Sequence, residues 1–186
     1  MRPIYNMADL SIIPECYIDT NLIETILPPQ KGYNHQKGAG NVVKLMRGKL
    51  VDKFAVGIID KDKKQLKYAE EFNKKIDIGN LLFYQHKTRP HFLIFINPAI
   101  EKWIMNNAAA VGISLSDYGL PIELKQLTKV TKKITSKKDA NFKKFFRELK
   151  KRDAKDILVL SRWLNYLKSN PYNIDLAEMK KIANKT

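Results

Sequence analysis

Short apolar runs alternate with amphipathic stretches along the first 113 residues. The continuous runs predict buried strands at residues 10–14, 54–59, 81–84 and 91–96. Apolar positions at helical spacing predict helices at residues 19–27, 41–50, 64–74 and 97–110. This order of elements predicts an α/β fold in which a mostly parallel central sheet is flanked by helices.

The chain beyond Ser114 has the pattern of helices alone. Residues 137–152 place Phe142, Phe145, Phe146 and Leu149 on one side, and residues 157–167 repeat that apolar spacing. Both tryptophans, Trp103 and Trp163, lie on apolar helix faces and are expected in the core. We therefore predict an α/β core over residues 1–113 and a helical region over residues 114–186 that packs on it.

The net charge of the chain predicts which kind of partner it binds. Lys and Arg number 34 against 19 Asp and Glu, which gives a net charge of +15 and predicts a polyanionic partner, nucleic acid first. Residues 121–152 hold 12 basic and 3 acidic residues, so the helical region is the basic part of the chain. The side chains there that we expect to bind phosphate are Lys137, Lys138, Lys143, Lys144 and Arg147.

Cysteine content and hydropathy indicate the cellular compartment in which we expect this protein. The single cysteine, Cys16, cannot form an intramolecular disulfide and excludes cysteine-based zinc sites. No signal-peptide pattern precedes Asp9, and no apolar stretch reaches the length of a membrane-spanning helix. A cytoplasmic protein that does not engage membranes is expected.

Acidic residues follow the predicted strands. Glu15 comes after residues 10–14, Asp60 and Asp62 end the run at 54–59, and Glu101 opens the helix after 91–96. In open α/β sheets, ligands bind outside the carboxyl ends of the strands. Clustered carboxylates there favour a hard cation such as Mg²⁺ or Mn²⁺. The alternative is ordinary helix capping by an Asp-x-Asp loop.

The acids occur in the order and spacing of a known family. Glu15 with Asp19 four residues later, a glycine-containing loop, and Phe-Ala-Val-Gly-Ile-Ile-Asp-Lys-Asp ending at Asp62 together resemble the toprim domain of topoisomerases, primases and overcoming-lysogenization-defect nucleases. The later Pro98-Ala-Ile-Glu-Lys-Trp103 is similar to a Pro-x-x-Glu-x-Trp segment of toprim-like proteins from phage-defence and mobile-element systems. The resemblance covers residues 10–110. It departs at Cys16, where many toprim domains have glycine.

The resemblance implies a toprim-like fold and metal-dependent phosphoryl transfer, most simply by a nuclease of a phage-defence or mobile-element system. Glu15, Asp60 and Asp62 would be the catalytic residues, and the same three with Asp19 and Glu101 would hold Mg²⁺ or Mn²⁺. The cations interleaved with the aspartates, Lys61 and Lys63, would neutralise a scissile phosphate.

Two further segments are candidates for phosphate contacts. His35-Gln-Lys37-Gly38-Ala-Gly40 leads into a predicted helix whose free amides suit an anion. It lacks the residues of a P-loop or dinucleotide fingerprint, so no organic cofactor is expected. Lys87 and Arg89 lie in a predicted turn.

Two alternatives to a nuclease remain open. The first is a non-catalytic module that binds nucleic acid or a protein partner on a toprim-like scaffold, and the second is an enzyme for a small phosphorylated substrate, which leaves the C-terminal charge unexplained. Self-association or a protein partner is compatible with each reading.

Overall fold

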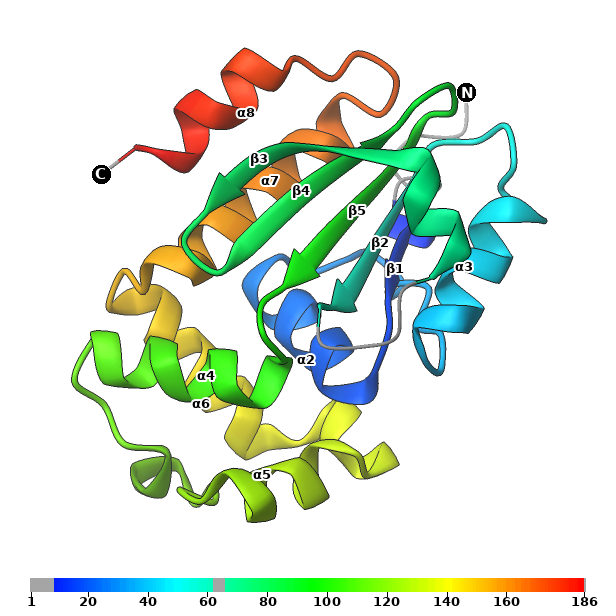
Figure 1. Cartoon of the computed structure of the whole chain (residues 1–186). Coiled ribbons are helices and arrows are strands. Elements are labelled where there is room, and N and C mark those ends of the chain that lie inside the picture. The colour runs from blue at the N-terminus through cyan, green and yellow to red at the C-terminus, as the bar shows by residue number, and fades with distance from the viewer. Residues whose placement is uncertain (1–8, 62–65, 186) are drawn as a thin grey trace.

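The computed structural model describes residues 9–61 and 66–185 (Figure 1). Within them a five-stranded sheet has the order β1-β2-β5-β4-β3. Its strands are β1 (Ile12–Pro14), β2 (Ala55–Asp60), β3 (Phe72–Ile78), β4 (Leu81–His86) and β5 (His91–Ile96). The pairs β1·β2 and β2·β5 are parallel, whereas β5·β4 and β4·β3 are antiparallel. The α/β class is confirmed, and the sheet is mixed.

The sheet is mixed rather than mostly parallel because β4 runs antiparallel to both of its neighbours, and one of these, β3, was assigned to a helix. Of the predicted helix at residues 64–74, the described part instead forms a 3₁₀ turn, η1 (Lys67–Glu71), followed by β3. Phe72 and Ile76 are buried in the clusters on opposite faces of the sheet, while Lys74 and Lys75 between them are exposed, as suits an edge strand. A register shift between Lys74 and Ile76 interrupts the period-two pattern, which hid the strand.

Helices cover both faces of the sheet. Val56 and Ile58 of β2 face a large cluster that includes α2 (Tyr17–Ile26) and α7 (Lys155–Ser169). Alternate residues of the same strand, Ala55 and Ile59, face α3 (Ala39–Arg47). The result is three layers, helix on sheet on helix, as the alternation of side chains along a strand requires.

Gly57 permits the close approach of α3 to the sheet. A Cβ atom at this position would lie 2.8 Å from carbons of both Leu93 and Val42. Real Cβ contacts are not that short, so only glycine fits without displacing the helix.

The remaining helices gather at one end of the sheet and along one face. They are α4 (Ile100–Ala110), η2 (Leu115–Tyr118), α5 (Leu124–Thr131), η3 (Ile134–Lys138), α6 (Ala140–Lys151) and α8 (Leu176–Ala183). In Figure 1 the arrowheads of β2 and β5 point toward α4 and α5. The apolar face of α6 and both tryptophans are fully buried, as predicted, in the cluster that also contains the sheet. Among the described residues, no helix combines the length and apolar character needed to cross a membrane.

Candidate functional site

Glu15 and Asp60 meet at the carboxyl ends of the parallel strands. Pro14 of β1 pairs with Ile58 of β2, so the residues that follow lie side by side. The backbone N–H of Glu15 donates to the carbonyl of Ile58 (3.0 Å), and that of Asp60 donates to Oε2 of Glu15 (3.0 Å). Both acids are buried, with 1% and 7% of their surfaces exposed. The parallel register thus brings together two acids 45 positions apart.

Asp60 also holds the start of α4. Its Oδ1 accepts the backbone N–H of Ile100 (3.0 Å), the first residue of that helix. The Ncap residue, Ala99, has no side chain able to do this, so Asp60 satisfies an amide that would otherwise lack a partner. The carboxylate thus lies at the amino-terminal end of α4, where a negative charge interacts favourably with the helix dipole.

Cys16 and Asp19 begin α2 beside these acids. Cys16 is the Ncap residue, and its Sγ accepts the backbone N–H of Asp19 at 3.4 Å. Burial raises the pKa of the Cys16 thiol, and the charge of Asp19 raises it further. The thiol is therefore neutral near pH 7 and unsuited to nucleophilic attack.

A cavity of about 660 Å³ opens beside Glu15 and Asp60. We call it the carboxyl-end cavity. Loop residues before α3, the first turn of α4, and α5 with the residue after it form its other walls. Its lining comprises Glu15, Cys16, Tyr17, Ile18, His35, Lys37, Asp60, Pro98, Ala99, Ile100, Glu101, Lys102, Leu124, Thr128, Thr131 and Lys132. Five of the residues singled out from sequence thus share one cavity: Glu15, Asp60, Glu101, His35 and Lys37.

Glu101 is held in this wall by α5. Its Oε1 accepts the hydroxyl proton of Thr131 at 2.6 Å, which links α4 to the basic C-terminal part of the chain. The sequence carried no local signal for Thr131 or Lys132, because their approach depends on how α5 packs against α4.

His35 is half-buried, and its ring is held by contacts with α2. The Thr20 hydroxyl donates to the carbonyl of Cys16 (2.8 Å), so its oxygen accepts from Nδ1 of His35 (2.8 Å). The imidazole stacks on Tyr17 with ring centroids 4.7 Å apart. Burial lowers the pKa of His35, and the charge of Lys137 lowers it further. The ring is thus neutral at pH 7, with its lone pair on Nε2.

Nε2 of His35 is buried and has no hydrogen-bond partner among the residues that the structure describes. A neutral imidazole nitrogen in this position is a potential proton acceptor or metal ligand. Because the ring lines the same cavity as Glu15 and Asp60, it belongs to the candidate site.

The loop before α3 is organised by β1. The backbone N–H groups of Asn34, Gln36 and Gly38 donate to the carbonyls of Ile12, Pro14 and Glu15. Gly38 has φ +92°, a conformation that favours glycine. Its amide is therefore engaged by Glu15 rather than free for a phosphate, and Gly40 lines neither the cavity nor this ladder.

The metal-ligand set predicted from sequence is only partly described. Asp62 and Lys63 lie outside the described residues. Within residues 9–61 and 66–185, no group of three or more His, Cys, Asp or Glu side chains is arranged to hold a metal ion. Glu15 and Asp60 remain as a pair of carboxylates, and Asp19 does not line the cavity.

The predicted phosphate contacts divide between distant places. Lys37 lines the cavity, the charge of Lys137 reaches His35, and Lys61 and Lys138 are exposed. Residues on the polar side of α6, opposite its apolar face, are Lys143, Lys144 and Arg147. None of these three lines the cavity.

Lys87 and Arg89 lie at the other end of the sheet. His91, which begins β5, pairs with Ala55, whereas Ile96 pairs with Asp60. The distance from His91 to Ile96 is five steps along the strand, which is roughly 17 Å at about 3.3 Å per residue. Side chains at this second end therefore cannot act on the same atom as Asp60.

Comparisons with known proteins did not extend this picture. No family model, curated protein or solved structure matches this chain. The resemblance to toprim domains therefore stays a prediction from the motifs, and the site has to be argued from its own residues.

Proposed function

We propose that this protein is a Mg²⁺- or Mn²⁺-dependent phosphodiester transferase that acts on nucleic acid, most simply a nuclease. One observation carries the proposal: the parallel register of β1 and β2 brings Glu15 and Asp60 to the wall of a cavity that also contains cations. Acids and lysines around one opening suit a substrate that is itself an anion and a cation that bridges it to the protein.

The donors present fit such a metal ion. Mg²⁺ is commonly bound by one or two carboxylates together with waters and substrate phosphates, and Glu15 with Asp60 would supply that pair. Asp62, two positions beyond Asp60, would extend the set. When bound, the ion would neutralise developing charge on the phosphate and lower the pKa of a coordinated water.

The protein's own groups would position the substrate. Lys37 and Lys132 line the cavity and attract a phosphate. His35, neutral and stacked on Tyr17, would accept a proton at Nε2. Glu101, fixed by the Thr131 hydroxyl, would orient groups at the opposite wall. The basic residues from 121 to 152 would hold the rest of the phosphate backbone.

A second candidate is a binding module without catalysis. A specific observation favours it, since Glu15 accepts the N–H of Asp60 and Asp60 accepts the N–H of Ile100. These bonds give both acids a structural reason to be buried here. The basic surface would then bind nucleic acid while the acids stabilise the fold.

A nuclease assay separates the two. The protein is incubated with labelled single- and double-stranded DNA and RNA in Mn²⁺, in Mg²⁺ and in EDTA, beside Glu15→Gln. The proposal expects cleavage that requires the metal and is lost in the variant, while binding in EDTA is unchanged. Metal-independent binding without cleavage of any substrate would favour the module.

A further inference from the structure

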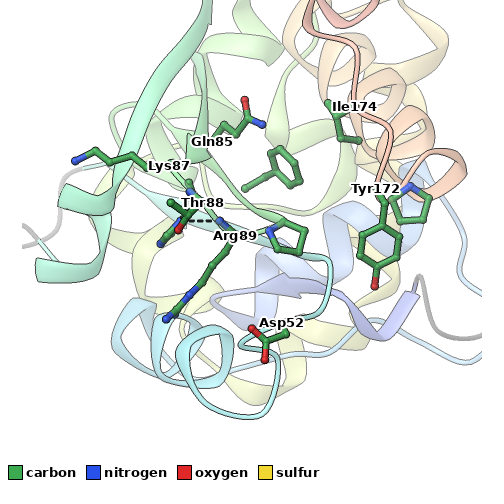
Figure 2. A pocket seen from close by; sticks show the side chains of 11 residues that line it. Asp52, Gln85, Lys87, Thr88, Arg89, Tyr172 and Ile174 are labelled. Carbon is green, nitrogen blue, oxygen red and sulfur yellow. Dashed lines mark hydrogen bonds between the residues drawn. The ribbon is translucent and has the colours of Figure 1, made fainter.

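A separate pocket lies at the amino end of β5. It has a volume of about 500 Å³, and its lining includes Asp52, Gln85, Thr88, Arg89, Pro90 and Tyr172. Figure 2 shows Arg89 and Tyr172 on either side of this amino-end pocket, with Asp52 between them. It shares no lining residue with the carboxyl-end cavity.

Tyr172 is the only aromatic ring among the large apolar side chains that are exposed in the described part of the chain. Its ring is 66% exposed, yet it is fixed in place. The backbone N–H of Phe54 donates to its hydroxyl (3.3 Å), and the two rings meet in a T-shaped arrangement with centroids 6.3 Å apart. A rigid ring open to solvent is a platform for a planar group at low entropic cost.

Arg89 supplies a cation on the opposite side. The turn that carries it is locked by His86, whose Nδ1 accepts the backbone N–H groups of Thr88 and Arg89 at 3.1 and 3.0 Å. Nε2 of His86 lies 3.0 Å from the carboxylate of Glu71, so both nitrogens of the buried ring have partners and hold the turn in place. In the described chain, no carboxylate forms an ion pair with Arg89. Its guanidinium does contact the Tyr68 hydroxyl, which counteracts the rise in the pKa of Tyr68 that burial causes.

The charged and polar groups around the pocket favour different parts of a ligand at its different sides. Lys87 also lines the pocket, and its ammonium donates one hydrogen bond to the carbonyl of Glu70 (3.1 Å). The amide of Gln85 and the carboxylate of Asp52 also line the pocket, and in Figure 2 Gln85 lies above and Asp52 below the level of Arg89 and Tyr172. An anion is therefore favoured at Arg89, and groups with N–H or O–H donors are favoured near Asp52.

We propose that the amino-end pocket binds an unpaired nucleotide, with the base against Tyr172 and the phosphate at Arg89. The volume lies within the usual range for small-ligand sites. Asp52 accepts from a sugar hydroxyl or a base amino group, and Gln85 contacts the edge of the base. A base paired in a duplex has no free face for Tyr172, so the pocket selects single strands or free nucleotides.

Equilibrium binding in EDTA tests this site independently of any cleavage. The probes are 5′-AMP, a fluorescein-labelled single-stranded 12-mer and the same 12-mer annealed to its complement. The variants are Tyr172→Ala, Tyr172→Phe and Arg89→Gln, with Lys181→Gln as a control on α8, where Lys181 pairs with Glu178 outside both cavities. Circular dichroism establishes that each variant is folded.

The proposal expects Tyr172→Ala and Arg89→Gln each to weaken binding of the single strand by about tenfold. Tyr172→Phe retains the ring and changes binding much less, and duplex affinity is nearly the same in all variants. The same losses for 5′-AMP identify a free nucleotide as the ligand, and losses confined to the 12-mer identify a strand. The proposal is overturned if Tyr172→Ala binds 5′-AMP and the single-stranded 12-mer as tightly as the unmodified protein does, or if the unmodified protein binds neither of them. Both outcomes hold whether or not the protein is a nuclease.

Discussion

The two ends of the sheet differ in charge, because one lies after the parallel strands β1 and β2 and the other holds the turn between β4 and β5. At the carboxyl end of β1 and β2, the buried acids Glu15 and Asp60 face a cavity. At the opposite end, Arg89 lies in the turn between β4 and β5. Because β4 is antiparallel to β5, the residues between them emerge at the amino end of β5.

Asp60→Asn is the largest perturbation of the carboxyl end. The amide keeps an oxygen that can accept from Ile100 but removes the charge, so we expect cleavage to fall about 100-fold or more, with binding in EDTA preserved. The matched control is Asp77→Asn, an exposed acid of β3 that pairs with Lys74. Equal loss of cleavage in both variants would mean that the carboxyl-end cavity has no special role.

Lys132→Glu tests whether the wall of that cavity binds phosphate. Lys132 lines the cavity and is exposed. We expect weaker binding of single-stranded DNA and a salt dependence of log K that is less steep by at least about 0.7. The control is Lys180→Glu, on the exposed side of α8 and outside both cavities. Identical salt slopes for the two variants would place the substrate elsewhere.

Tyr68→Phe perturbs the amino end by removing a buried hydroxyl that contacts both His91 and Arg89. The Tyr68 hydroxyl lies 2.5 Å from Nδ1 of His91, and both residues are buried. The second ring nitrogen of His91 donates to the carbonyl of Leu50 (2.8 Å), so the hydroxyl must be the donor to Nδ1. Removing it should lower the free energy of unfolding by about 1–2 kcal/mol in urea titrations. A change in metal-dependent cleavage per folded molecule would show that the two ends are coupled.

Acidification gives the smallest effect and involves both ends. Burial lowers the pKa of His91, and burial followed by the charge of Lys137 lowers that of His35. Below pH 6.5, the ordinary pKa of histidine, the unfolded chain binds more protons than the folded protein, because the folded histidines have lowered pKa values. The free energy of unfolding therefore falls as the pH falls. Urea titrations at pH 7.5, 6.5 and 5.5 should show a shallower decline for His35→Gln and for His91→Gln. A decline as steep as that of the unmodified protein in both variants would assign the pH dependence to other groups.

Much of this architecture is readable from local pattern. The run ending at Asp60 predicted β2, and the apolar spacing around Phe146 predicted the buried face of α6. β3 was missed because the register shift before Ile76 moves its two buried residues, Phe72 and Ile76, to opposite faces of the sheet, so no period-two pattern is left. The antiparallel pairing of β4 with β5 was missed separately, because both strands were predicted but not their relative direction.

The candidate site was predictable where it depends on strand ends. Glu15 and Asp60 follow buried strands, and parallel pairing alone brings them together. Thr131 and Lys132 were not predictable, since they reach the cavity only through the packing of α5 on α4. Tyr172 was missed because its place beside Phe54 and Arg89 depends on the tertiary fold, and these residues are far from it in the sequence.

The central claim is that the acids at the carboxyl end hold a divalent cation. Titration of the nucleic-acid-free protein with Mn²⁺, followed by electron paramagnetic resonance, measures this directly. We expect saturable binding in the unmodified protein and in Asp77→Asn, and an affinity at least about tenfold weaker in Glu15→Gln and Asp60→Asn. The same Mn²⁺ affinity in all four proteins, or no saturable binding in any of them, would contradict it.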